Sequence, residues 1–99
     1  MNVNEEATKA VNVIVSALEH ELPEWEVYLT TQDGQGIAMI RAEVRVGEGQ
    51  KRFYCQHEYS YRDLTNMHPA MLPSRGIDLA LRWRNELRKA KKDASKFGV

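Results

Sequence analysis

The sequence predicts an α+β domain of α-β-β-β-α order, in which a three-stranded antiparallel sheet carries two helices on one face. Residues 24–61 contain three segments of alternating apolar and polar residues, separated by short turns rich in glycine. An acidic amphipathic segment precedes them and a basic one follows. A chain of 99 residues has the size of one domain, so we expect residues 1–99 to fold as a single unit.

The first helix is expected over residues 5–21. Asn4 suits the N-cap position, and Glu5 and Glu6 favour the positive end of the helix dipole. Pro23 ends the helix. Apolar residues recur every three or four positions and form one stripe for burial: Ala7, Val11, Ile14, Leu18 and Leu22.

The three strands are expected over residues 25–31, 37–46 and 51–61. Asp33-Gly34 predicts a two-residue turn between the first two, because a type I′ turn needs positive φ at both central positions. A hairpin centred there has a definite register, which decides which residues are cross-strand neighbours. The expected neighbours are Leu29 with Ala38, Val27 with Ile40, Tyr28 with Met39, and Thr30 with Ile37.

Residues 47–50 form the second turn. We expect a four-residue loop, because it pairs Val44 with Phe53 and Ala42 with Cys55 on the inner face. The same register sets Arg45 opposite Arg52, and like charges in these positions repel. A bound anion or a nearby acid could offset the repulsion, or the two long side chains could splay apart.

Residues 62–74 are expected to form an irregular loop that contains Pro69 and Pro73. Its apolar Met67 and Met71 indicate that it packs down as a flap. The last helix is expected over residues 75–96, with Ser74 as its cap. Its apolar stripe would comprise Ile77, Ala80, Trp83, Leu87, Ala90, Ala94 and Phe97.

Two helices on one face leave the other sheet face open, where Tyr28, Ile37 and Met39 gather. Contiguous exposed apolar residues usually mark an interface, although the 62–74 loop could instead cover them. We expect a small non-enzymatic binding or regulatory module, such as an inhibitor or adaptor. It would dock a protein partner or itself, as a homodimer, through this face and the loop. The expected contact residues are Tyr28, Ile37, Met39, Tyr54, Met67 and Met71.

The alternative function is nucleic-acid binding through the basic last helix. Residues 1–33 hold seven acids and one base, whereas residues 75–99 hold eight bases and three acids. Clustered cations of this kind can bind phosphates, but they can also form a solvated helix face or lie beside acids of the first helix. The candidate contact residues are Arg82, Arg84, Arg88, Lys89 and Lys92.

The topology is similar to that of double-stranded RNA-binding domains. Residues 33–36 and 44–47 lie about where those domains have a first-hairpin glycine and the end of the second strand. Their last helix begins with a lysine-rich run that contacts phosphates, whereas residues 73–76 of this chain contain one base, Arg75. The resemblance is therefore one of topology.

No residue pattern predicts catalysis, a cofactor or a small-molecule substrate. Cys55 and His57 share a strand face, but no second pair has the spacing of a metal site, so we expect no metal. No apolar run reaches the ~20 residues that span a membrane. One cysteine cannot form an internal disulfide, and residues 1–7 lack a signal-peptide pattern. We therefore expect a cytoplasmic protein without a membrane partner.

Overall fold

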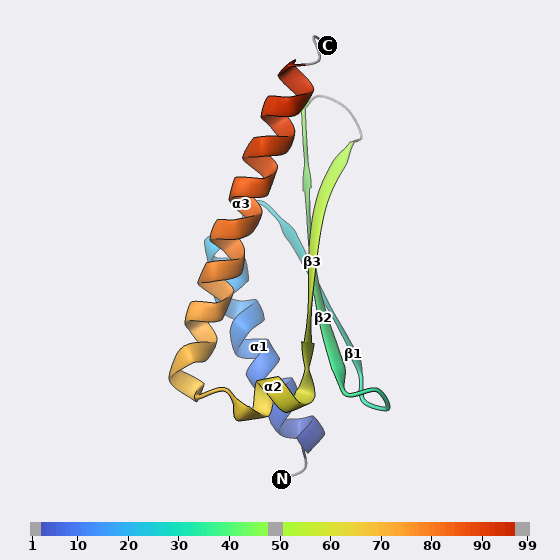
Figure 1. The fold of residues 1–99 in the computed structure, drawn as a ribbon, viewed down its shortest axis with the longest axis vertical. Coiled ribbons are helices and arrows are strands. Elements are labelled where there is room, and N and C mark those ends of the chain that lie inside the picture. Colours follow the sequence, from blue (N-terminus) through green and yellow to red (C-terminus); the bar gives the residue numbers. More distant parts are fainter. Residues whose placement is uncertain (1–2, 48–50, 97–99) are drawn as a thin grey trace.

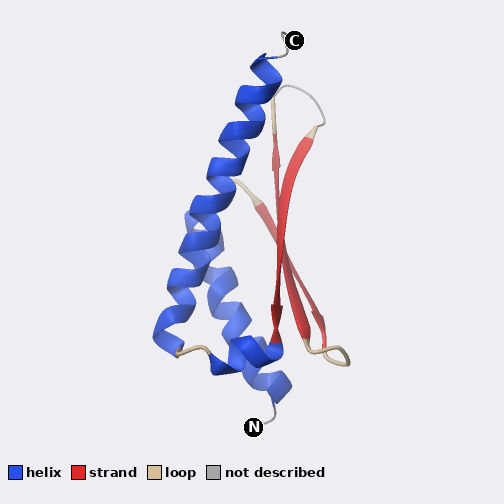
Figure 2. Cartoon of the chain, in the orientation of Figure 1, coloured by secondary structure: helices blue, strands red, loops and turns tan. Residues whose placement is uncertain are grey.

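The computed structural model describes residues 3–47 and 51–96, and it has the predicted α+β fold. The strands form one antiparallel sheet in the order β1-β2-β3. Figures 1 and 2 show the helices on one side of this sheet, so its other face is open. The elements are α1 (Val3–Glu21), β1 (Glu26–Gln32), β2 (Ile37–Arg45), β3 (Arg52–Ser60), α2 (Tyr61–Asn66), the short 3-10 helix η1 (Pro69–Met71) and α3 (Leu72–Lys96).

The core lies between the sheet and the two long helices. The central strand β2 contributes Ala38, Ile40 and Ala42, none of which has any exposed surface. The predicted stripe of α1 is buried at every position, because its spacing of three and four residues keeps it on one side of the helix. From α3 the buried residues are Leu72, Leu79, Ala80 and Trp83.

The helices α1 and α3 approach closely at Gly76, which has no side chain to hold them apart. A Cβ atom placed there would lie 2.8 Å from the Cβ of Ala17 and would also overlap the backbone of Ile14. Ile77, the residue that follows this glycine, is 39% exposed. The prediction that Ile77 is in the core is therefore wrong, because Gly76 takes the place against α1 at this turn, whereas Ala80 and Trp83 of the predicted stripe are buried. Phe97, the last residue of that stripe, lies outside the described residues.

The register of the first hairpin differs from the prediction by two residues. Leu29 pairs with Ile40 and Val27 with Ala42, because the turn has four residues, 33–36. Gly36 takes the positive φ of 64°, a conformation that glycine adopts without steric cost. Tyr61 holds this longer turn, since its N–H donates to the Gly36 carbonyl at 2.7 Å and its hydroxyl to Asp33 Oδ1 at 2.5 Å.

The predicted register of the second hairpin is confirmed. Val44 pairs with Phe53, Ala42 with Cys55, and Arg45 with Arg52. A backbone hydrogen bond of 3.1 Å from Val46 N–H to the Lys51 carbonyl closes the pair. Three of the four predicted loop residues, 48–50, lie outside the described residues.

Residues 62–74 are mostly helical, which corrects the predicted irregular loop. Ser60 caps α2 by accepting a hydrogen bond of 3.1 Å from the Asp63 N–H. The side chain of His68 caps η1 in the same way, and Pro69 follows at a position where no N–H is needed. The last helix then begins at Leu72, so Ser74 lies inside α3 and is not its cap. Likewise, α1 begins at Val3, so Asn4 lies inside it.

The segment that contains α2 and η1 packs on the helix side of the sheet. α2 contacts α1, and η1 contacts α3. Tyr61 and Leu64 are buried there because the one-turn spacing of these residues gives α2 a single apolar side. This segment therefore lies beside the N-terminal half of α1 near the lower end of the sheet (Figure 1), and it does not cover the open face as a flap.

Candidate functional site

The open face consists of the outward side chains of the three strands. They alternate with the residues that enter the core, as the two-residue period of a strand requires. None of them is a lysine. β1 contributes Glu26, Tyr28, Thr30 and Gln32, β2 contributes Ile37, Met39, Arg41, Glu43 and Arg45, and β3 contributes Arg52, Tyr54, Gln56, Glu58 and Ser60.

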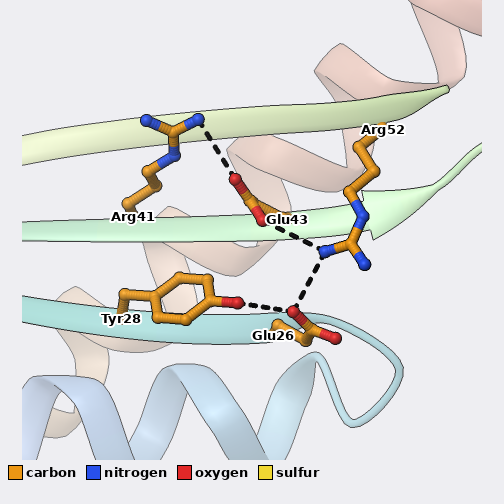
Figure 3. Close-up of polar contacts among 5 residues, drawn as sticks. All are labelled: Glu26, Tyr28, Arg41, Glu43 and Arg52. Atoms are coloured by element: carbon orange, nitrogen blue, oxygen red, sulfur yellow. Dashed lines mark hydrogen bonds and ion pairs between the residues drawn. The ribbon is translucent and has the colours of Figure 1, made fainter.

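Arg52 is the centre of a polar network that crosses this face (Figure 3). Its Nη1 lies 3.1 Å from Glu26 Oε2 on β1 and 3.3 Å from Glu43 Oε2 on β2. One guanidinium therefore connects all three strands. The same contacts explain how the sheet tolerates the like charges of Arg45 and Arg52 in opposite positions, because two nearby acids offset the positive charge of Arg52.

Two tyrosines complete the network at its sides. The Tyr28 hydroxyl donates a hydrogen bond of 2.5 Å to Glu26 Oε2. Arg41 forms an ion pair of 3.1 Å with Glu43, and its guanidinium carbon lies 4.1 Å from the centre of the Tyr54 ring. The two tyrosine rings remain about half exposed, so the network holds aromatic surface in fixed positions facing solvent.

The contacts of the network favour one protonation state of each of three groups. The hydrogen bond from Tyr28, followed by Arg52, lowers the pKa of Glu26 below its usual value. The same hydrogen bond raises the pKa of Tyr28, because ionising the phenol would remove the donor to Glu26. Glu26 also raises the pKa of Arg52. The network therefore favours a charged Glu26, a charged Arg52 and a neutral Tyr28.

The predicted apolar cluster on the open face is more dispersed than expected. Met39 lies opposite Thr30 and Glu58, and Ile37 lies between Gln32 and Ser60, because the first register is shifted by two residues. Tyr28 pairs with Arg41. Because the shift is even, every predicted open-face residue still lies on the open face. Ile37 and Met39 are half-buried there.

Met67 and Met71 are not part of this surface. Met67 packs against the core from the helix side, and Met71 is 46% exposed in η1. The structure therefore separates the six predicted contact residues into four on the open face and two on the opposite side.

The candidate nucleic-acid residues on α3 lie in three different surroundings. Arg84 bonds to the carbonyl of Glu21 and lies 4.0 Å from its carboxylate, so it ties α3 to α1. Arg82 lines a groove described below. In the described ranges, the remaining cations of the exposed side form no ion pair; they are Arg88, Lys89, Lys91 and Lys92.

Cys55 lies in a protected position between β3 and α3. Its thiol is 6% exposed and donates to Glu86 Oε2 at 3.1 Å. Burial, followed by the contact with Glu86, raises the pKa of Cys55 to about 12, so the thiol is protonated at neutral pH and unreactive. His57, two residues away, stacks edge-on against Tyr59 with ring centres 4.5 Å apart. Nowhere in residues 3–47 and 51–96 do three or more potential metal ligands gather.

A groove that we did not predict from the sequence lies between β3 and the first half of α3. Its volume is about 470 Å³. Four of its lining residues lie on one side of α3: Arg75, Asp78, Leu79 and Arg82. Their spacing of three and four residues is the signal in the sequence that could have indicated a common surface. The groove is lined by His57, Glu58 and Tyr59 of β3, by Asp63, Asn66 and Met67 at α2, and by Arg75, Asp78, Leu79 and Arg82 of α3.

Over the part of the chain that the structure describes, no helix combines the length and apolar character needed to cross a membrane. Comparison of the chain with protein-family models, with curated proteins and with solved structures found no match.

Proposed function

We propose that the chain is a non-enzymatic module that docks a protein through the open face, and that the protein is a second copy of this chain. The observation that carries the proposal is the composition of that face. Tyrosine, arginine and methionine are enriched at protein interfaces, whereas lysine is depleted. The open face contains two tyrosines, three arginines and one methionine, and no lysine.

The charge of the face favours a second copy as the partner. Three acids and three bases lie on it, so the face has no net charge and two copies brought together carry no net repulsion. In a two-fold dimer the same patch must be complementary to itself. The network already offers both signs in neighbouring positions, with Glu26 and Glu43 on either side of Arg52.

The order of the side chains also supports docking. Immobilising a mobile side chain on binding costs about 0.5–1.5 kcal/mol. Tyr28 and Arg52 are already held by Glu26, and Tyr54 lies against Arg41. Much of this ordering cost is therefore met in the single chain, before any partner arrives.

Light scattering over a concentration series tests the proposal. The wild-type chain should form a dimer, and Met39→Glu should weaken it at least about tenfold, because it buries a new charge in the interface, while circular dichroism shows that the chain remains folded. Ile77→Glu is the matched control, since Ile77 is an exposed apolar residue on α3. A wild-type chain that stays monomeric, or a dimer that only Ile77→Glu disrupts, would refute docking through this face.

Nucleic-acid binding through α3 is a second candidate, favoured by one observation. Arg88, Lys89, Lys91 and Lys92 are exposed, and among the described residues none has an ion-pair partner. Arg88→Glu with Lys92→Glu should abolish a salt-dependent shift of a labelled duplex. Arg84 is left unchanged in this test, because its contacts with Glu21 support the fold. A duplex shift that persists in the double variant would exclude this role for α3.

A further inference from the structure

We propose that the groove between β3 and α3 binds an extended, carboxylate-bearing peptide, which adds to the free edge of β3 as a fourth strand. Of the residues that line this groove, only Glu58 also belongs to the open face, and the proposal does not depend on docking there. The groove has the volume of a ligand pocket, for which the usual range is about 300–1,000 Å³.

The first argument is the position of β3. It is an edge strand, because the sheet order is β1-β2-β3 and β3 pairs only with β2. Side chains of a strand alternate between faces, yet the consecutive residues His57, Glu58 and Tyr59 all line the groove. The groove therefore lies along the edge of the strand, where unpaired backbone groups can bond a further strand.

The second argument is the shape of the remaining walls. α3 presents one side along the groove, with Arg75 and Arg82 two helical turns apart and Leu79 between them. Residues of α2 and the following bend, among them Asn66 and Met67, close one end. In Figure 1, α2 follows directly from the lower end of β3 and lies between that strand and the start of α3. An added strand would thus have a backbone partner on one side and side-chain contacts on the other.

The third argument is charge. Arg75 and Arg82 form no ion pair within the described residues, so both guanidinium groups are available to a ligand. Burial raises the pKa of Tyr59, and the two arginines oppose that shift more strongly than Asp78 adds to it. Burial and Arg82 lower the pKa of His57, which favours its neutral form. Positive charge in the groove is therefore confined to Arg75 and Arg82, which lie near His57 and Tyr59, whereas Glu58, Asp63 and Asp78 make other parts of the lining acidic.

These features define the ligand. Its backbone must be extended and must retain the N–H groups that pair with β3. One carboxylate should lie beside the arginines, and its other side chains should be uncharged, because further acids would meet the acidic residues of the groove. Alternating valine and threonine favour the extended form.

A thermodynamic cycle tests the proposal with two synthetic heptapeptides. Both alternate threonine and valine, and both have blocked ends. One carries aspartate at the centre and the other asparagine. The aspartate peptide should bind about tenfold more tightly to the wild-type chain, as measured by fluorescence anisotropy at low salt. In Arg75→Gln with Arg82→Gln this preference should disappear, while affinity for the asparagine peptide stays the same.

The matched control is Arg88→Gln with Lys89→Gln, which removes the same charge from α3 outside the groove; it should keep the tenfold preference. A peptide with proline in place of the central residue should not bind, because it cannot donate to the strand. Amide NMR shifts should change at residues 57–59. No binding of the aspartate peptide, an equal loss in both charge variants, or shifts confined to the open face would each overturn the proposal. So would self-association that only the Arg75 and Arg82 variant abolishes, since the groove would then hold a second copy.

Discussion

The inner and open faces of the sheet are built from the same three strands but are held by different interactions. On the inner face of β2, Ala38, Ile40 and Ala42 have no exposed surface. On its open face, Arg41 and Glu43 are held by ion pairs and by a tyrosine ring. Burial of apolar surface contributes far more to stability than exposed ion pairs do. The comparison therefore indicates that the inner face contributes most of the stability of the fold and the open face contributes little.

The largest expected difference is between neighbouring residues of β2. Ile40→Ala should lower the free energy of unfolding by about 2–5 kcal/mol, because it leaves a cavity under the helices. Met39→Ala, on the open face, should cost less than about 1 kcal/mol. Urea unfolding followed by circular dichroism measures both. Equal losses would contradict the comparison, since the open face would then behave as core.

The inner face also depends on the close approach of α1 and α3. Gly76→Ala should lower the free energy of unfolding by about 1–3 kcal/mol, because the new Cβ overlaps Ala17 and the backbone of Ile14. This loss would occur although alanine favours helix by about 1 kcal/mol. Asn85→Ala, at an exposed position of α3, is the control and should be neutral or slightly stabilising. A Gly76→Ala chain as stable as the control would show that the helices can move apart freely.

Cys55 provides a pH-dependent test of the inner face. Its pKa is raised from 9.0 to about 12 by burial and Glu86. Above about pH 9 the unfolded thiol loses its proton while the folded one keeps it, so stability should fall as pH rises from 8 to 10. The expected loss is on the order of 1 kcal/mol relative to Cys55→Ala. Iodoacetamide should also react much faster with the denatured chain. Parallel pH profiles for the two chains, or equal alkylation rates, would place the thiol in solvent.

The smallest expected effect concerns Arg52, at the centre of the open face. Arg52→Ala should cost less stability than Ile40→Ala or Gly76→Ala, because Arg52 and Glu26 are exposed to water, and the cost should shrink in high salt. Denaturant unfolding at two salt concentrations measures this, with Arg45→Ala as the control, since Arg45 forms no ion pair with any residue that the structure describes. A loss as large as that of Ile40→Ala that salt does not reduce would make the network part of the structural core.

The fold class and the division of the strands into two faces could be predicted from the sequence. Alternation in β2 places Ala38, Ile40 and Ala42 inside whichever register the first hairpin adopts. The register itself could not be predicted from Asp33-Gly34, because contacts with Tyr61 select the four-residue turn. The Asp33-Gly34 dipeptide contains no information about Tyr61, which follows β3 in the chain and contacts the turn only in the folded structure.

The candidate sites show the same limit. The open face could be predicted because strand periodicity alone determines it. The network around Arg52 could not, since it depends on the pairing of all three strands. The helix α2 has only six residues, which are too few to show a helical period. The sequence therefore predicts residues 62–66 as part of a loop. The groove beside β3 was missed for the same reason, because α2 closes one end of it.

The contact between Tyr61 and the first turn has a consequence for the order of folding. The hydroxyl of Tyr61 reaches a side chain 28 residues earlier in the chain, and its N–H bonds the same turn. As the chain leaves the ribosome, β1 and β2 emerge before Tyr61 does, and so before the contact that selects their alignment. The early hairpin can therefore exchange between alignments, and β3 must arrive before one of them is kept. We therefore expect the first turn to be fixed late in folding, after β3 has brought Tyr61 beside it.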